Sequence, residues 1–308
     1  MANKSGGEQY ESLKSLNQQL TLEATDAYFG KKSIPFGDAQ KKALNLVGDD
    51  GKFTNLALLL SEQCRHVIKL GVFEGNAISV LKDRYEFTGS VLKQLEDIFS
   101  FIDRFNGTRA EYRGLDRIDK RDYPVEAIRE SLLNAIVHRA YELVPSSLIS
   151  VFDDRLEFIT IGGLMKGISM NDIMLGVSAL RNPRLAEVFY RLNLIEAHGM
   201  GMQKIYDSYS EFAIKPKTVY SDNAFKITLP NTNHHSSETT KIDLGEREKK
   251  VISLAKKQKR ITRKDIEEVL EISQATAIIL LREMTEKGLL SKTGQGKNIR
   301  YECHAAIE

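Results

Sequence analysis

Hydrophobic and polar positions change their pattern along this chain, and the changes mark the elements that it is expected to form. Residues 23–30 and 36–47 have helical patterns, and residues 92–105 form an amphipathic helix with one apolar side. The run H-V-I-K-L-G-V-F at residues 66–73 predicts a strand, and a short apolar run covers residues 54–61. The first 105 residues therefore predict mixed α/β structure, and we find no site chemistry in them.

After residue 123 the pattern predicts a helix, a hairpin, a loop and a second helix. Pro124 suits the start of the first helix, where a missing N–H costs nothing. Residues 148–152 and 156–161 are predicted strands, joined by Asp153-Asp154-Arg155 as a tight turn. A further strand-like run, F-K-I-T-L-P, ends at Pro230.

The helix after Pro124 carries three polar residues at a regular spacing. Glu130, Asn134 and His138 recur every fourth residue, so they share one face, while the other faces are apolar enough to pack on a sheet. A carboxylate and a carboxamide one turn apart suit a hydrated Mg²⁺ ion, because the amide oxygen is a hard ligand and the carboxylate can accept a proton. The spacing alone fits a solvated helix face equally well.

Two groups of glycines follow, at places where a phosphate-binding loop would need them. Gly162-Gly163 ends a predicted strand, and Gly199-Met200-Gly201 precedes a predicted helix at residues 202–209. Glycines let N–H groups close on phosphate oxygens, and a helix N-terminus adds a favourable dipole. Residues 166–198 between them are long enough for a mobile lid, with Arg181 inside it. Each glycine group by itself also fits a plain turn.

These patterns together carry a family resemblance over residues 121–232. The chain has A-I-R-E-S-L-L-N-A-I-V-H-R-A-Y, D-D-R-L-E-F-I-T-I-G-G-L, R-N-P-R-L-A and E-A-H-G-M-G-M-Q-K-I, in that order. It resembles the divergent branch of the GHKL ATPases that is often labelled "helicase C-terminal-like" or "ATP-binding regulator". The resemblance implies an α/β fold, an α+β sandwich of the GHKL or Bergerat type, with ATP and Mg²⁺ as cofactors.

The resemblance also implies roles for individual residues. Asn134 would be the magnesium ligand, and Glu130 would orient or deprotonate the attacking water. The remaining implied nucleotide contacts are Gly162 and Gly163, Gly199 and Gly201, Arg181 in the lid, and His138, which fits a satisfied helix-end histidine as well. Three departures from the family put catalysis in doubt. Thr160 stands where the wider class has an adenine-binding aspartate, Ala140 replaces an aspartate, and Met200 replaces a threonine. Nucleotide binding is expected, but efficient hydrolysis is not implied.

The C-terminal region predicts three helices and a two-stranded wing, and it resembles a winged helix. Residues 241–308 hold 15 lysine and arginine residues against 11 aspartate and glutamate residues, which supports DNA binding. The predicted DNA contacts are Ser273, Gln274 and Thr276 around the recognition helix, and Lys292, Lys297 and Arg300 in the wing. Ile278 and Ile279 cannot both be core, so a protein-interaction module is the alternative.

Length, composition and charge limit the remaining choices. The 308 residues predict four segments: an N-terminal α/β segment at 1–110 that resembles the trailing part of a Schlafen/AlbA-like region, a GHKL-like domain at 111–232, a linker at 233–245 and a winged helix at 246–308. The net charge of +2 gives no argument for nucleic acid from the chain as a whole. Two separated cysteines and the lack of a signal peptide or long apolar run predict a reduced, cytoplasmic protein with no membrane partner.

We therefore expect an ATP-binding, DNA-binding transcriptional regulator in which nucleotide biases the winged helix. The alternatives are an ATPase that acts on nucleic acid and a relic that binds no nucleotide and serves as an interaction protein. The ATPase alternative is disfavoured because the sequence has no G-x-x-x-x-G-K-[ST] loop. Homodimerisation on double-stranded DNA is an expectation from the habits of winged helices.

Overall fold

The computed structural model describes residues 9–196, 199–234, 246–258, 260–286, 289–293 and 299–303. The chain divides into two compact units, Met1–His234 and His235–Glu308, which are described separately below. None of the helices in the described part of the chain combines the length and the hydropathy that a bilayer crossing requires.

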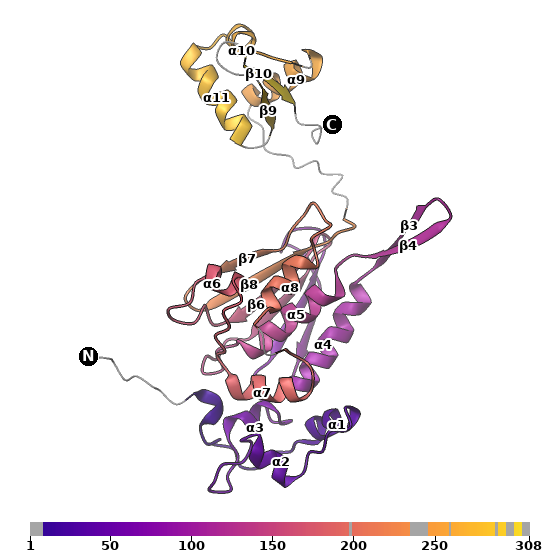
Figure 1. Cartoon of the computed structure of the whole chain (residues 1–308), viewed down its shortest axis with the longest axis vertical. Helices are drawn as coiled ribbons and strands as arrows, with labels where there is room; N and C mark the ends of the chain where they lie inside the picture. The colour runs from indigo at the N-terminus through magenta and orange to yellow at the C-terminus, as the bar shows by residue number, and fades with distance from the viewer. Residues whose placement is uncertain are drawn as a thin grey trace, which may run out of the picture. The chain divides into compact units, whose positions relative to one another are not determined.

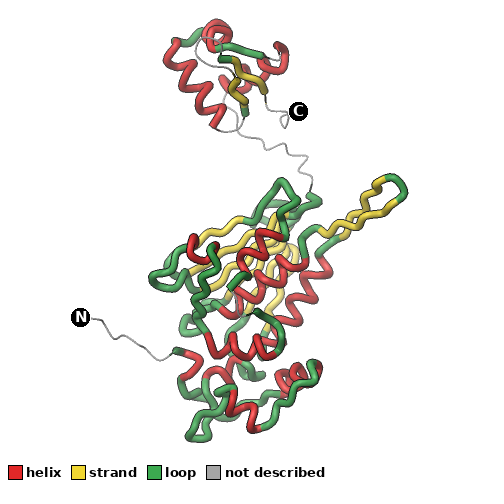
Figure 2. The backbone as a smooth tube through the Cα atoms, in the orientation of Figure 1, coloured by secondary structure: helices red, strands yellow, loops and turns green. Residues whose placement is uncertain are grey.

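The N-terminal unit is organised around a six-stranded mixed sheet (Figures 1 and 2). The strand order is β2-β1-β5-β6-β8-β7, and only the neighbours β1 and β5 run parallel. The strands are β1 (Ile68–Phe73), β2 (Leu81–Phe87), β5 (Ser147–Val151), β6 (Arg155–Ile161), β7 (Lys217–Tyr220) and β8 (Ala224–Pro230). This arrangement confirms the predicted α/β class.

Helices cover one face of this sheet, and the burial of alternate strand residues shows which face it is. In β6, Leu156, Phe158 and Thr160 are buried, whereas the residues between them are partly exposed, as the two-residue period of a strand requires. The helices over this face are α4 (Val91–Phe105), α5 (Val125–Val137) and α8 (Gly201–Asp207) (Figure 1). Helix α5 is buried along most of its length, so the helix that carries Glu130 and Asn134 lies at the centre of the unit.

Residues 9–60 pack into the same hydrophobic core as the sheet. They form η1 (Tyr10–Ser12), α1 (Glu23–Lys31), α2 (Asp38–Ala43) and α3 (Asn55–Leu59). The carboxylate of Glu11 is fully buried and accepts hydrogen bonds from the N–H groups of Arg184, at 2.7 Å, and Leu185, at 2.8 Å. These N–H groups belong to the first turn of α7 (Pro183–Arg191), so a residue from the start of the chain caps a helix beside the cavity described below.

The hairpin of β3 (Thr108–Arg113) and β4 (Asp116–Arg121) stands apart from the sheet (Figure 1). It projects from the N-terminal unit as a two-stranded arm between α4 and α5. The residue proposed as a domain boundary, 110, lies within β3.

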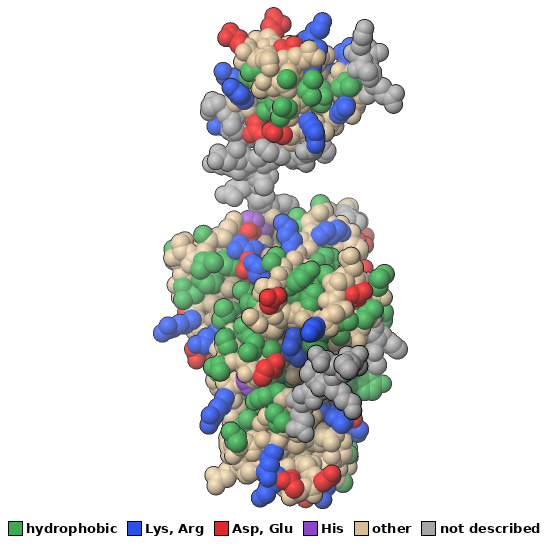
Figure 3. Space-filling model, turned by 90° about the vertical axis from the view of Figure 1, so that its left-hand side faces the viewer, with side chains coloured by type: hydrophobic (Ala, Val, Ile, Leu, Met, Phe, Trp, Pro, Cys, Tyr) green, Lys and Arg blue, Asp and Glu red, His purple; other side chains and the backbone are tan. Residues whose placement is uncertain are grey.

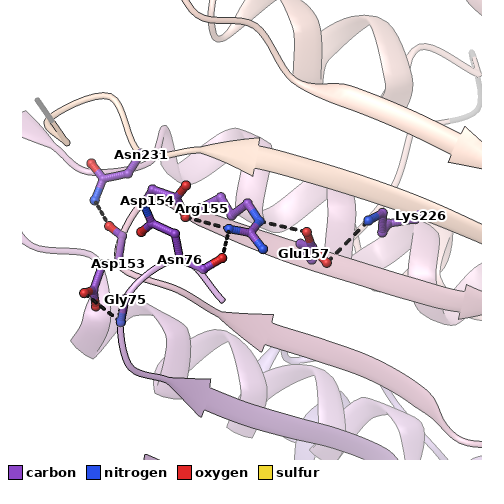
Figure 4. A network of polar contacts seen from close by, with 8 residues as sticks. All are labelled: Gly75, Asn76, Asp153, Asp154, Arg155, Glu157, Lys226 and Asn231. Carbon is purple, nitrogen blue, oxygen red and sulfur yellow. Dashed lines mark hydrogen bonds and ion pairs between the residues drawn. The ribbon is translucent and has the colours of Figure 1, made fainter. Parts of the chain in front are cut away.

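The D-D-R turn of the family pattern joins three loops at one end of the sheet (Figure 4). Asp153 accepts a hydrogen bond from the Gly75 N–H at 3.0 Å, and Arg155 donates to the Asn76 carbonyl at 3.0 Å. Arg155 also donates to the side chains of Asp154 and Glu157, both at 2.8 Å. These bonds hold the turn to the neighbouring loop, so this part of the family pattern stabilises the end of the sheet. Neither aspartate is among the residues that line the cavity described below.

Most predicted strands and helices of the N-terminal unit are confirmed, but one helix prediction was wrong, and several elements, among them β2, the β3–β4 arm, α7 and β7, were not predicted. The helix predicted at 36–47 is only α2, because Asn45 takes the left-handed conformation with φ 58° soon after its end. Strand β2 was missed since six of its seven residues are exposed and show no alternation. The arm was missed because its charged sequence resembles a loop.

The C-terminal unit contains three helices and a two-stranded sheet. These are α9 (Glu246–Gln258), α10 (Arg263–Leu270), α11 (Gln274–Glu286), β9 (Leu290–Thr293) and β10 (Arg300–Cys303). Ile266 of α10 is buried, whereas Val269, one turn further along the helix, is 46% exposed. Ile278 and Ile279 are both exposed, at 48% and 57%, so neither belongs to the core of this unit. The winged-helix assignment stays a prediction.

Candidate functional site

A cavity of about 370 Å³ lies between the end of β6, α5, α8 and the segment that connects β6 to α8. Its walls include all eight residues that the sequence predicts for the nucleotide site: Glu130, Asn134, His138, Gly162, Gly163, Arg181, Gly199 and Gly201. Most of the remaining wall is apolar, with Leu133 and Val137 from α5 and Phe225 and Ile227 from β8. The fold therefore brings residues from positions 130 to 201 to one place, whereas their individual roles remain predictions.

Glu130 lies where α5 and α8 meet, with 8% of its surface exposed. Its carboxylate forms an ion pair with Arg129, which also donates to the Leu194 carbonyl. Burial raises the pKa of Glu130, and the positive charges of Arg129 and Lys204 oppose that shift. Lys204 itself lies on α8 and pairs with Glu196 at 2.8 Å.

Gly201 allows the start of α8 to approach α5 closely. A Cβ atom at this position would lie 2.9 Å from Oε2 of Glu130 and 3.6 Å from both amide atoms of Asn134. The Asn134 amide nitrogen is 3.7 Å from the sulfur of Met202. The predicted metal ligand and the predicted base thus face the first turn of α8 directly.

Gly162 and Gly163 are held by the turn between β7 and β8. Their N–H groups donate to the carbonyls of Asn223, at 2.8 Å, and Asp222, at 3.2 Å. A Cβ atom on Gly163 would lie 2.1 Å from the Ser221 carbonyl oxygen, so only glycine fits there. These two N–H groups are satisfied by the fold, and the pair's predicted approach to a nucleotide remains untested.

Ala140, one of the departures from the family pattern, packs against Gly162. Its N–H donates to the Ile161 carbonyl at 2.8 Å, and its side chain is buried. A Cβ atom on Gly162, whose φ is +110°, would lie 3.0 Å from the Ala140 Cβ. Since an aspartate here would place a charge in this tight contact, the alanine suits the local packing.

Arg181 and Asn182 anchor the far end of α5. The Arg181 guanidinium donates to the carbonyls of His138, at 3.2 Å, and Gly163, at 2.8 Å. The buried Asn182 amide donates to the carbonyls of Val137 and Arg139, both at 2.8 Å. The R-N-P pattern therefore joins α5 to the end of β6, and Asn182 is a positioning residue that the sequence analysis did not single out.

His138 is the C-cap residue of α5 and lines the cavity. Burial lowers its pKa from 6.5 to about 4, and the positive charge of Arg181 acts in the same direction. Among the described residues, none donates to or accepts from this ring. His138 is therefore a neutral side chain near pH 7 with both ring nitrogens available to a ligand.

The connecting segment, expected to be a lid over residues 166–198, consists of two different parts. Residues 163–181, which contain the short α6 (Met170–Met174), include no buried residue, whereas Leu185, Val188 and Phe189 of α7 are fully buried. Gly199, with φ +65°, lies against the first part, since its Cβ would be 2.7 Å from the Ser178 Cβ. The first part therefore touches the core only through partly buried side chains such as Met170, Ile173 and Met174 of α6.

Two cavity residues were not predicted as site residues. Thr160 is buried on β6 and lines the cavity two positions before Gly162, where the wider class has an adenine-binding aspartate. Lys204 lies three positions after Gly201 and brings a positive charge to the Glu130 side. Two sequence signals could have identified them. Thr160 lies on the predicted strand two residues before the first glycine pair, and Lys204 lies one helical turn after Gly201.

The predicted DNA contacts lie at two places in the C-terminal unit. Ser273 caps α11 through the Thr276 N–H at 3.3 Å, and Gln274 is exposed beside it. Lys292 and Arg300 are exposed on β9 and β10, but Lys292 pairs with Tyr301 and Arg300 with Thr293, which puts the two basic side chains on opposite faces of the hairpin. Lys297 lies outside the described residues.

The visible surface shows no dominant charge. On the face that Figure 3 presents, basic and acidic side chains are interspersed with apolar ones in both units. The same balance is present in the net charge of the chain, +2. Any nucleic-acid contact would therefore depend on a local set of residues.

Comparisons with known proteins agree with this geometry. Residues 147–229 match the family described as "Putative ATP-dependent DNA helicase recG C-terminal". The match covers about a quarter of the chain and begins after α5. No curated protein matches the chain.

A solved structure supports the fold over a longer range. The crystal structure of the DIP2311 protein from Corynebacterium diphtheriae superimposes with a TM-score of 0.64 at 17% identity. The similarity covers 98% of this chain but 65% of that one, so the present chain spans about two thirds of the length of its structural relative. Over residues 147–229 the resemblance to a divergent GHKL-like ATPase family is confirmed.

Proposed function

We propose that this chain is an ATP-binding regulator of DNA, in which the cavity of the N-terminal unit takes ATP with Mg²⁺ and the C-terminal unit contacts double-stranded DNA. The convergence of the eight family-pattern residues on one cavity is the observation that carries this proposal. The family match over residues 147–229 supports an ATPase-like domain.

The residues of the cavity fit such a ligand. The amide oxygen of Asn134 is a hard, neutral oxygen suited to Mg²⁺, and Lys204 supplies a positive charge for phosphates. The ion, when bound, would shield the charge of the phosphate oxygens. Glu130 is already paired with Arg129, so we propose that it orients a water molecule and that turnover is slow.

A route from the cavity to the C-terminal unit starts at the entry of α5. The chain that leaves β8 is bonded to the base of the arm: the Thr232 N–H donates to the Asp122 carbonyl at 2.7 Å, and the Asn233 amide donates to the Asp122 carboxylate at 3.0 Å. Asp122 lies two residues before Pro124, the N-cap residue of α5. A nucleotide can act along this route only if it binds one arrangement of the chain more tightly than another.

Calorimetry with ATP and Mg²⁺ tests the first part of the proposal. We expect the native chain to bind and Asn134→Ala to lose at least about tenfold in affinity, because a lost metal ligand or charged contact costs about 1.4 kcal/mol or more. Asn171→Ala, at an exposed position on α6, is the matched control. No binding by the native chain would contradict the proposal, and unchanged binding by Asn134→Ala would remove Asn134 from the site.

Duplex-DNA binding with and without ATP and Mg²⁺ tests the second part. We expect Gln274→Ala to weaken binding, and the affinity to change when nucleotide is added. Equal affinity in the two conditions would disprove the coupling, and absent DNA binding would leave the C-terminal unit as a protein-interaction module, for which the exposed Ile278 and Ile279 are the candidates.

A nucleic-acid-dependent ATPase is the second candidate, because the matching family's description names a DNA helicase. ATP-driven separation of a labelled duplex would favour it over the regulator.

A further inference from the structure

The β3–β4 arm leaves two sheet edges without a partner. Among the described residues, no third strand pairs with either β3 or β4. An isolated two-stranded hairpin is marginally stable in water, and free strand edges are templates for pairing with another chain. The arm projects clear of the sheet and its helices (Figure 1), so its edges are open to a partner beyond the base. At the base, the carbonyls of Lys120 and Arg121 accept hydrogen bonds from the side chains of Asn233 and Thr232.

The charges of β4 are arranged so that the strand is complementary to itself. Its sequence is D-R-I-D-K-R, with Ile118 as its one apolar residue. If two copies run antiparallel around Ile118, Arg117 of one copy faces Asp119 of the other, and Asp116 faces Lys120. Each pair occurs twice by symmetry, and opposite charges that face each other across strands are stabilising.

We propose that the arm joins two copies of this chain by antiparallel pairing of β4 with β4 of the second copy, centred on Ile118. The result would be a four-stranded sheet with a two-fold axis, made of the two arms. A symmetric pairing of this kind closes on itself and therefore produces a dimer and not a fibre.

The hydrogen bonds of the arm are compatible with this pairing. Gly114-Leu115 is a two-residue turn, so the flanking pair Arg113–Asp116 is the first bonded pair of the hairpin. Hydrogen-bonded pairs recur at every second residue of β4 after Asp116. The residues between them, Arg117 and Asp119, therefore direct their N–H and C=O groups away from β3. These are the two residues that face each other in the proposed register, and the Ile118 pair is a close, non-bonded one.

The side chains at this edge are accessible for exchange between copies. Arg117 and Asp119 pair with each other at 2.8 Å within one chain, and their side chains are 60% and 52% exposed. An exposed ion pair of this kind contributes little to the stability of the chain. Replacing it by the same pair between two copies therefore costs little free energy.

Apolar residues at the two ends of the arm extend the complementarity. Leu115 at the tip is fully exposed and Tyr112 is 70% exposed, while Phe105 at the base of the arm is 40% exposed. In the proposed register the tip of one arm lies beside Arg121 at the base of the other. The exposed tip of each copy would thus be covered by the base of its partner.

The other edge and other partners fit less well. The sequence of β3, T-R-A-E-Y-R, has a single acidic residue and so offers fewer opposite-charge pairs to a second copy than β4 does. A nucleic acid would favour a continuous basic stripe, whereas acidic residues alternate with basic ones along β4.

Sedimentation equilibrium of the full chain at several concentrations tests the proposal. The interface is small, so we expect association at roughly micromolar to 100 micromolar concentration. Arg117→Asp and Asp119→Arg should each remain monomeric, because each sets like charges opposite one another twice. An equimolar mixture of the two variants should associate again, since every pair in the mixed dimer is then Asp opposite Arg.

Cross-linking checks the register independently. Ile118→Cys in a Cys303→Ser background should form an intermolecular disulfide on mild oxidation, because the Cα atoms of a close antiparallel pair are about 4.5 Å apart. Lys120→Cys should not, as it faces residue 116. A native chain that stays monomeric, or single variants that associate as the native chain does, would overturn the proposal. Duplex-DNA binding that is lost in Arg117→Asp, with no dimer in the native chain, would overturn it in favour of a nucleic-acid ribbon.

Discussion

The two glycine groups that border the cavity are held by different kinds of contact. The N–H groups of Gly162 and Gly163 both donate to carbonyls of the β7–β8 turn, and a Cβ atom on Gly163 would collide with main-chain atoms of that turn. Gly201 instead faces the carboxylate of Glu130 and the amide of Asn134, which are ends of movable side chains. One wall is therefore part of the rigid sheet, and the other can adjust when α8 or a ligand moves. Glycine therefore has two uses in this family pattern. At Gly163 it allows tight packing within the sheet, and at Gly201 it allows α8 to approach Glu130 and Asn134.

Gly163→Ala tests the rigid wall most severely. The added Cβ would lie 2.1 Å from the Ser221 carbonyl oxygen and 2.6 Å from that of Asp222, so the backbone must move. We expect a loss of about 3 kcal/mol or more in the free energy of unfolding, or a chain that does not fold. Urea unfolding followed by circular dichroism measures this. Gly30→Ala, with no atom within 4 Å of the added Cβ, is the control, and an equal effect in both variants would contradict the contrast.

Asn182→Ala tests how firmly the rigid wall is joined to α5. The substitution removes two hydrogen bonds of 2.8 Å to the carbonyls of Val137 and Arg139 in a buried setting. We expect the free energy of unfolding to fall by about 2 kcal/mol, the usual cost of leaving buried polar groups unpaired. The same unfolding experiment applies, with the exposed Asn171→Ala as control. A change below about 0.5 kcal/mol would show that other contacts hold this junction.

Gly201→Ala tests the adjustable wall. The added methyl group would meet Oε2 of Glu130 at 2.9 Å, but that carboxylate can rotate, and alanine favours a helix over glycine. We therefore expect stability to change by less than about 1 kcal/mol while ATP affinity falls by more than in Gly30→Ala. A loss of stability as large as that of Gly163→Ala would mean that both walls are equally rigid.

His138→Gln tests the pH dependence of stability at the cavity, and we expect the smallest of the four effects from it. The folded protein keeps His138 neutral because its pKa is lowered to about 4, while the unfolded chain takes up a proton near 6.5. The free energy of unfolding should therefore decrease as pH falls from 7 towards 4, and this decrease should be smaller in the variant. Urea midpoints at pH 7 and pH 5 measure the difference. Some pH dependence will remain, since burial also lowers the pKa of His66 to about 4.

The sequence by itself determined the helix face of Glu130, Asn134 and His138, the strands on either side of the D-D-R turn, and the order of the glycine groups. These features depend on local periodicity and on turn residues, which act between near neighbours in the chain. The same local reasoning missed β2 and the arm, because exposed strands carry no alternation of apolar residues.

Only the tertiary structure decided what the residues of the family pattern contact. The N–H groups of Gly162 and Gly163 are bonded to residues about sixty positions later, Arg181 is engaged by carbonyls of His138 and Gly163, and Glu11 caps a helix more than 170 residues away. Contacts between distant segments depend on how the sheet and helices pack, which no local pattern records. The charge pattern of β4 is present in the sequence, but only the tertiary structure shows that β3 and β4 form a separate two-stranded sheet.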